Sequence, residues 1–218
     1  MKGVTLTTFR RHFGADRTKA QLRKISDEQL SLIYRKGYWK ATQGDALPGG
    51  VDLVAFDSAV NSGPRRAAKW VQGAVGANQD GKIGPKTLEK IAEWGALDVI
   101  DGALDRRLAF LQSLNNWSVF GGGWGRRVEE TRHEAHQMAG GASDLRRPSV
   151  DYVVVRLGSK GAVEEEWIRR LQTGLGVVSD GDFGPKTEAA LRKYQRENGL
   201  HVDGVAGRQV YRSMGLVS

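Results

Sequence analysis

The sequence predicts a mainly α-helical protein with two domains. Apolar residues recur at helical spacing through most of the 218 residues, and glycine and proline mark where the helical segments end. A nine-residue phrase occurs twice, as QDGKIGPKT at 79–87 and SDGDFGPKT at 179–187. The small, polar and proline residues of GGASDLRRPS at 140–149 indicate a linker. We therefore predict domains at 1–139 and 156–218, joined by a linker at 140–155.

Composition and charge exclude several classes of protein. The chain has no cysteine, which rules out disulfides, thiol catalysis and cysteine zinc sites. No stretch approaches the ~18 apolar residues of a membrane span, and the N-terminus lacks the apolar core of a signal peptide. The net charge is +8, of which residues 1–40 carry +7. A basic face of this kind favours a polyanionic partner, and nucleic acid, a membrane surface and the bacterial wall all qualify; a simply solvated face is the alternative.

The first part of the chain is predicted to be helical with sharp turns. Residues 18–40 show near-helical apolar spacing, and Ser26 with Gln29 forms a capping box that restarts the helix there. DALPGG at 45–50 is a turn, residues 51–61 form an apolar helix, and SGP at 62–64 ends that helix and begins the next.

The rest of the chain continues this pattern. Residues 86–113 predict two helices with a break near Gly95. FGGGWG at 120–125 predicts a glycine-rich loop that holds Phe120 and Trp124, followed by a further helix. YVVV at 152–155 predicts a short strand or extended arm, and short helices fill the remainder.

The repeated phrase belongs to a longer repeat, because residues 71–91 align with 171–191 without a gap. Gly176 suits a helix C-cap, Asp-Gly makes a tight turn, Phe183 enters the core, and Pro185 begins the next helix. A third, degenerate copy lies at 202–215. The identical pairs are Gln72/Gln172, Gly76/Gly176, Asp80/Asp180, Gly81/Gly181, Gly84/Gly184, Pro85/Pro185, Lys86/Lys186 and Thr87/Thr187.

On these motifs the region 157–216 resembles the peptidoglycan-binding domain family, a small three-helix module. The segments LQ, DGDFGPKT, YQRENGL and VDG occur in the family's order. The resemblance implies that this domain binds the bacterial wall through a shallow groove near the turns. The wall-binding turn would then comprise Asp180, Gly181, Phe183, Gly184 and Thr187.

Residues 1–139 resemble the lysozyme-like muramidases of glycoside hydrolase family 108. The matching pieces are KGVTLTTFRR at 2–11, YRKGYW at 34–39, FDSAVNSGP at 56–64, AAKWVQGAVGANQDGKIGPKT at 67–87 and FGGGWGRRV at 120–128. The resemblance implies a lysozyme-like helical domain with an internal peptidoglycan-binding-like repeat at about 65–95. Sugar rings stack on aromatic side chains and amides bind their hydroxyl groups. The expected substrate-binding residues are Thr5, Tyr38, Trp39, Asp57 and Asn61.

The catalytic acid of that family has no counterpart in this sequence. The family uses the Glu of a Glu-Gly-Gly-Tyr motif, which the resemblance places upstream of Met1, and the motif occurs nowhere in the 218 residues. Three explanations stay open: further residues upstream carry the Glu, the chain is a non-enzymatic remnant, or another carboxylate takes the role. Asp57 is the first substitute candidate, followed by Glu28 and Asp16, although a helical Asp is commonly a cap or ion-pair partner.

The resemblance implies a wall hydrolase of the muramidase or endolysin type that cleaves the β-1,4 bond between N-acetylmuramic acid and N-acetylglucosamine. The alternative is a non-catalytic peptidoglycan-binding protein. We expect peptidoglycan as partner, no nucleic acid because no known reader motif is present, no membrane insertion, no cofactor and no metal. His133 and His136 do not form a zinc motif and are expected on a solvated face. Without a signal peptide, the protein would be made in the cytoplasm and reach the wall through holin-type release or dedicated secretion.

Overall fold

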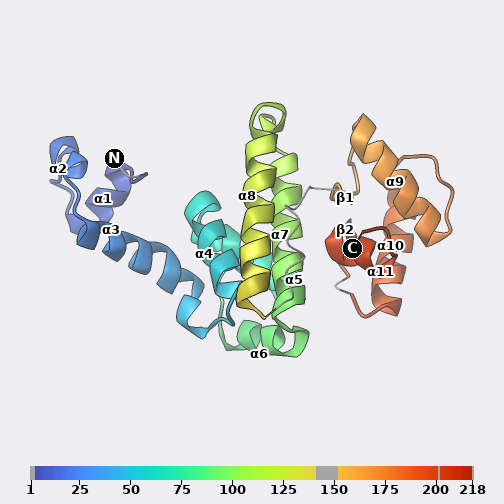
Figure 1. Cartoon of the computed structure of the whole chain (residues 1–218), viewed down its shortest axis with the longest axis horizontal. Coiled ribbons are helices and arrows are strands. Elements are labelled where there is room, and N and C mark those ends of the chain that lie inside the picture. The colour runs from blue at the N-terminus through green and yellow to red at the C-terminus, as the bar shows by residue number, and fades with distance from the viewer. Residues whose placement is uncertain (1–2, 141–151, 201, 218) are drawn as a thin grey trace.

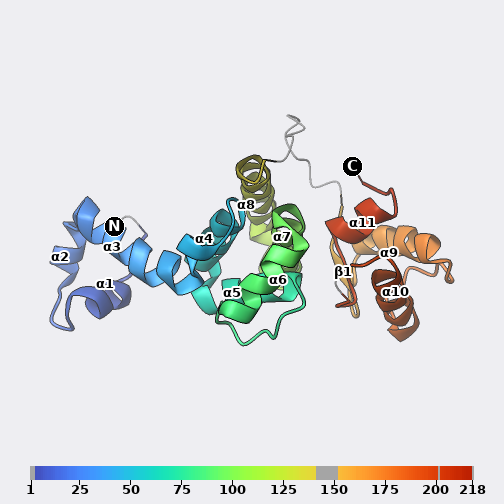
Figure 2. The ribbon, with the colours of Figure 1, turned by 90° about the horizontal axis from the view of Figure 1, so that it is seen from below.

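A computed structural model of the chain describes residues 3–140, 152–200 and 202–217, and it confirms the mainly α-helical class. Figure 1 shows three groups of elements in a row, with α1–α3 at one end, α4–α8 in the middle and α9–α11 at the other end. The view in Figure 2 gives the same order. The elements are α1 (Leu6–Phe13), α2 (Lys19–Arg23), α3 (Asp27–Tyr34), a π-helical turn (Arg35–Trp39), two 3₁₀ turns (Lys40–Thr42 and Gly44–Ala46), α4 (Val51–Ser62), α5 (Pro64–Ala74), α6 (Pro85–Trp94), α7 (Ala96–Gln112), α8 (Trp117–Met138), β1 (Val155–Arg156), α9 (Ala162–Leu175), α10 (Pro185–Glu197), β2 (Val205–Ala206) and α11 (Arg208–Ser213).

The N-terminal lobe, residues 3–34, has a small core of its own. Two capping boxes break the predicted helix at 18–40 into α2 and α3, one at Thr18 with Gln21 and the expected one at Ser26 with Gln29. Each box satisfies backbone N–H groups that the start of a helix leaves free. The buried residues of this core are Val4, Phe9, Leu22, Ile25 and Ile33.

The middle of the molecule is organised around α7, which has 11 of its 17 residues buried. Helices α4, α5 and α8 all pack against it. As predicted, α6 and α7 are separate helices that meet at Gly95. No helix in the described parts of the chain is both long and apolar enough to cross a bilayer.

The prediction of a glycine-rich loop at 120–125 is wrong, because these residues lie inside α8. The Trp117 ring lies across Gly121, where a Cβ atom would come within 2.6 Å of the ring. Gly121 and Gly125 are buried together with Val128 on the face that packs against the helical core. Tertiary packing therefore outweighs the cost of glycine in a helix, which is about 1 kcal/mol per residue relative to alanine.

Part of the predicted linker is packed into the core of the molecule. Of the predicted linker 140–155, residues 141–151 lie outside the described residues, but residues 152–155 are part of the core rather than a linker. Tyr152, Val154 and Val155 are buried, and β1 pairs antiparallel with β2 with Val155 opposite Ala206. Their apolar side chains join one continuous core that also contains residues of α4, α5, α7 and α8.

Each copy of the repeat is held by a buried glutamine that we call the glutamine latch. In the second copy, Gln172 Nε2 donates to Asp180 Oδ1 at 2.7 Å and to the Asp182 carbonyl at 3.0 Å. Gln172 Oε1 accepts from the Gly181 N–H at 2.9 Å, so both ends of the amide are used. The latch thus ties α9 to the Asp-Gly turn that precedes α10.

The same geometry occurs in the other two copies. Gln72 donates to Asp80 at 2.8 Å, and Gln195 donates to Asp203 at 2.8 Å. Both glutamines also accept from the glycine N–H that follows the aspartate, at 2.9 Å. The glycines of the three turns have φ values of 81°, 78° and 71°, a region that L-residues with a Cβ rarely adopt. The sequence repeat is therefore a structural repeat in all three copies.

The latch predicts a specific loss of stability. In Gln172→Ala the Asp180 carboxylate and the Asp182 carbonyl each lose a hydrogen-bond donor, and the Gly181 N–H loses its acceptor. We expect the free energy of unfolding to fall by about 2–3 kcal/mol, measured by urea denaturation. Gln172→Glu should be at least as destabilising, because it places a second carboxylate against Asp180.

Gln137→Ala, on the exposed surface of α8, is the matched control and should change the unfolding free energy by less than about 0.5 kcal/mol. Equal effects of Gln172→Ala and Gln137→Ala would show that the latch contributes nothing.

Candidate functional site

Asp57 lies on α4 at the centre of a buried group of charges. Its Oδ2 accepts from Arg107 Nη1 on α7 at 2.6 Å, and its Oδ1 accepts from Arg127 Nη2 on α8. The Asp57 and Arg107 side chains are 9% and 3% exposed, whereas that of Arg127 is 54% exposed. The aspartate therefore joins three helices, and its carboxylate is fully engaged by two guanidinium groups.

Two further polar groups complete the surroundings of Asp57. Asn61 Nδ2 donates to the Asp57 carbonyl at 2.8 Å, which places the amide one helical turn along α4. Thr131 Oγ1 lies 3.5 Å from Asp57 Oδ2 and donates to the Arg127 carbonyl at 2.8 Å. The structure thus places the Asp57 and Asn61 side chains next to each other on α4. Asn61 is exposed, so its side chain borders the solvent beside this group of charges.

The predicted aromatic residues lie on a different side of α4. The Tyr38 and Tyr34 rings are 5.6 Å apart, and the Trp39 ring is 5.9 Å from that of Phe56. Trp39 Nε1 donates to Asp45 Oδ1 at 2.8 Å, and its ring covers Gly44 so closely that no Cβ would fit there. The aromatic side chains therefore pack against Phe56. Its neighbour Asp57 instead faces the two arginines of α7 and α8.

Thr5 is the remaining predicted substrate-binding residue, and it lies on the N-terminal lobe. Its side chain accepts from the Thr8 N–H at 3.1 Å and caps α1. The neighbouring residue Val4 belongs to the core of that lobe, which is separate from the core that surrounds Asp57. In this structure the Thr5 side chain therefore serves as the N-cap of α1.

The five residues of the predicted wall-binding turn shape the turn itself. Phe183 is buried in the core, and Thr187 accepts from Gln172 Nε2 at 3.1 Å. The backbone N–H of Asp182 and the amide of Gln172 lower the pKa of Asp180 from its ordinary value. Gly184 leads directly into α10. The turn is thus a rigid feature held by internal hydrogen bonds, and its exposed surface is set by α9 and α10.

Of the two histidines of α8, His136 departs from the predicted solvated face, whereas His133 makes its hydrogen bond at the exposed surface. His136 is 18% exposed and its Nε2 lies 3.0 Å from Asp101 Oδ1 on α7. His133 contacts Gln137 at 3.1 Å. Within the residues that the structure describes, no group of three or more His, Asp or Glu side chains is arranged to hold a metal ion.

Sequence reasoning missed the partners that hold the site together. Arg107, Arg127 and Thr131 lie 50, 70 and 74 residues from Asp57, and no local pattern links them. The glutamine latch had a visible signal, because Gln72 and Gln172 are identical in the alignment. Gln195 also lies eight residues before Asp203, the same spacing as in the first two copies.

Two family models match this chain. The family described as glycosyl hydrolase 108 matches residues 1–63, and the putative peptidoglycan binding domain matches residues 166–214. The first region contains Asp57 and Asn61 together with the aromatic residues beside α4. The second region contains the latch of the second copy, the turn at Asp180 and α11.

A solved structure and a characterised protein also match parts of this chain. The solved structure of SagA from Brucella abortus is 40% identical to this chain, with a TM-score of 0.60, and the match covers 63% of this chain and 79% of that one. The zinc D-Ala-D-Ala carboxypeptidase of Streptomyces albus G is 37% identical over 65 residues, and the chain spans 24% of the length of that relative. The chain therefore belongs to the glycosyl hydrolase 108 family, and its C-terminal part matches the peptidoglycan-binding domain family.

Proposed function

We propose that this protein is a peptidoglycan hydrolase of the N-acetylmuramidase type, which cleaves the β-1,4 bond between N-acetylmuramic acid and N-acetylglucosamine. The observation that carries the proposal is the presence, on one chain, of a glycosyl hydrolase 108 match and a peptidoglycan-binding match. The wall-binding domain would hold the enzyme on its insoluble substrate, so that the hydrolase part meets glycan strands at high local concentration.

The charge of residues 1–40, which include the N-terminal lobe, supports an anionic polymer as the substrate. Residues 1–40 carry +7 of the total charge of +8. Arg10, Arg11 and Lys19 are exposed on this lobe, as are Arg23 and Lys24. Bacterial walls are anionic, so a basic lobe at one end of the molecule would attract the wall and raise the rate of encounter.

The chemistry of glycoside hydrolysis requires a carboxylic acid that protonates the leaving oxygen. Asp57 is poorly placed for this step, because both of its oxygens accept hydrogen bonds from guanidinium groups. A general acid must present a proton to the substrate, whereas Asp57 serves as an ionic joint between α4, α7 and α8. This observation favours the second candidate function, a non-catalytic wall-binding protein, for the 218 residues by themselves.

A lysis assay separates the two functions. We expect purified peptidoglycan treated with the muramidase to lose turbidity and to gain new reducing ends of N-acetylmuramic acid. New reducing ends of N-acetylglucosamine would contradict the proposed bond. Sedimentation of the chain with the wall, without any new ends, would identify a binding protein.

In that last case a helix bearing Glu-Gly-Gly-Tyr can be joined to the N-terminus, with Gln-Gly-Gly-Tyr as its matched control. Activity in the Glu form alone would assign the proton donor to that residue. Activity in neither form would leave the binding function.

Asp57→Asn tests whether this residue is structural or catalytic. Because Arg107 is buried and would lose its counter-charge, we expect the free energy of unfolding to fall by about 3 kcal/mol, measured by chemical denaturation. Asp52→Asn is the matched control in the first turn of the same helix, where an acidic residue contributes less than about 1 kcal/mol. Unchanged stability together with abolished lysis in Asp57→Asn would instead make Asp57 the acid.

A further inference from the structure

The third copy of the repeat differs from the first two at the positions that face α7. In the first two copies the helix after the turn begins with a proline, Pro85 or Pro185, whereas α11 begins with Arg208. Proline has no N–H, but Arg208 has one, and it donates to Asp105 Oδ2 on α7 at 2.6 Å. The third copy therefore uses a backbone donor that the other copies lack, and its acceptor comes from the other domain.

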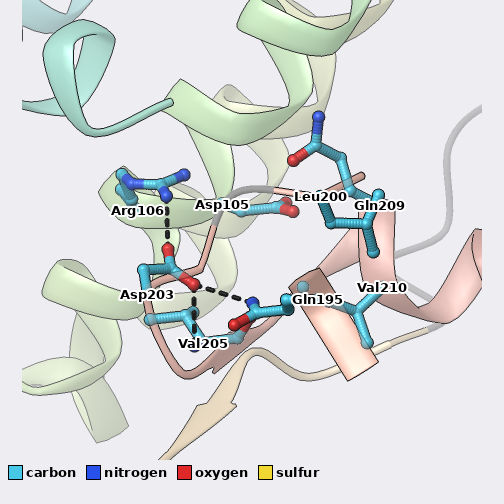
Figure 3. A pocket seen from close by; sticks show the side chains of 9 residues that line it. Asp105, Arg106, Gln195, Leu200, Asp203, Val205, Gln209 and Val210 are labelled. Carbon is cyan, nitrogen blue, oxygen red and sulfur yellow. Dashed lines mark hydrogen bonds and ion pairs between the residues drawn. The ribbon is translucent and has the colours of Figure 1, made fainter. Parts of the chain in front are cut away.

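The aspartate of the third turn also has a second partner. Asp203 Oδ1 accepts from Gln195 and from the Val205 N–H, as in the other copies. Its Oδ2 pairs with Arg106 of α7, as Figure 3 shows. Among the described residues, the corresponding oxygens of Asp80 and Asp180 have no such ion pair.

The glycine before α11 permits this close approach. A Cβ atom at Gly207 would overlap the carboxylate of Asp105, so the Gly207 backbone lies directly against the Asp105 side chain. At Gly84, which holds the same position in the first copy, a Cβ atom would meet nothing within 4 Å. Gly84 and Gly207 both have φ −125°, so the two positions differ in what lies opposite and not in backbone strain.

Behind these contacts lies a buried cluster of charges on α7 and α8. Arg132, with a side chain only 1% exposed, pairs with Asp101 at 2.6 Å, Asp105 at 2.9 Å and Glu129 at 3.2 Å. Tyr152 of the C-terminal domain contributes its hydroxyl group, which donates to Asp105 at 2.9 Å. Burial by itself would raise the pKa of Asp101, but Arg132 and His136 hold it well below its usual range.

The cluster carries more negative than positive charge, and two arginines of α11 lie close to its carboxylates. Three carboxylates surround Arg132, so this group has a formal charge of −2 when all three are ionised, and burial raises the pKa of Asp105. Arg208 lies 4.0 Å from Glu129, and Arg212 lies 3.5 Å from Asp101. Opposite charges thus meet across the boundary between the domains, and a buried group of this kind is stable only when each charge is paired.

We propose that the third copy of the repeat is an intramolecular docking element that fixes the peptidoglycan-binding domain on α7 and α8 in one orientation. The domain is then a rigid extension of the hydrolase domain instead of a module on a flexible tether. Among the described residues, Asp180 and Gly181 form their hydrogen bonds within their own repeat, so this turn stays available for a ligand. The idea that this ligand is the wall rests on the proposed function, but the docking does not.

The absence of cysteine makes a distance measurement straightforward. Cysteines introduced at Glu134 on α8 and Lys193 on α10, both exposed, would carry spin labels for a pulsed electron–electron distance measurement on the full chain. We expect a single narrow distance distribution for the parent protein and for Gly84→Ala. Gly207→Ala should broaden the distribution at least twofold, because the added methyl group pushes α11 away from Asp105.

Arg106→Gln provides a second variant that removes the ion pair with Asp203 without adding volume to the interface. Circular dichroism should show unchanged helix content in each variant, so that broadening reports separation of the domains. A broad distribution in the parent protein, or narrow ones in both Gly207→Ala and Arg106→Gln, would overturn the proposal. Sedimentation with peptidoglycan is measured separately: its absence in the parent would count against the proposed function and would leave the distance result intact.

Discussion

The burial of α7 is the constraint on which the rest of the structure depends. This helix is covered by α4, α5 and α8 and, on its remaining side, by α11. It nevertheless carries Asp101, Asp105 and Arg107 at buried positions. A charge removed from water is tolerated only when it is paired and hydrogen-bonded. Each of these residues therefore fixes the position of a neighbouring element.

The partners of these three residues explain the architecture. Arg107 requires Asp57, which sets α4 against α7 and engages Arg127 of α8. Asp101 and Asp105 require Arg132, which sets α8 in register with α7. Asp105 also accepts from Tyr152 and from Arg208, which belong to the C-terminal domain. The same helix thus organises the hydrolase domain on one side and its junction with the wall-binding domain on the other.

One repeated unit serves three purposes in this chain. Between α5 and α6 it forms a corner of the hydrolase domain, and between α9 and α10 it forms the exposed turn of the wall-binding domain. Between α10 and α11 it lies against α7. The glutamine latch keeps the backbone of the turn the same in each place, while residues outside the latch, such as Pro185 or Arg208, decide what the turn contacts. The same turn geometry can therefore occur in three places while its flanking residues make different contacts in each.

The sequence by itself determined the helical class, most helix boundaries, the repeat with its Phe183 anchor, and the family resemblance. These depend on signals carried by neighbouring residues, namely the capping box at Ser26, the proline at the start of α5, and the spacing of apolar positions. Only the tertiary structure decided that residues 120–125 are helical, since the burial of Gly121, Gly125 and Val128 on one face of α8 offsets the low helical propensity of glycine. It also decided that Asp57 is an ionic joint and that the third repeat contacts α7. Those outcomes depend on groups 50 to 103 residues apart, whose pairing is set by burial and leaves no local pattern in the sequence.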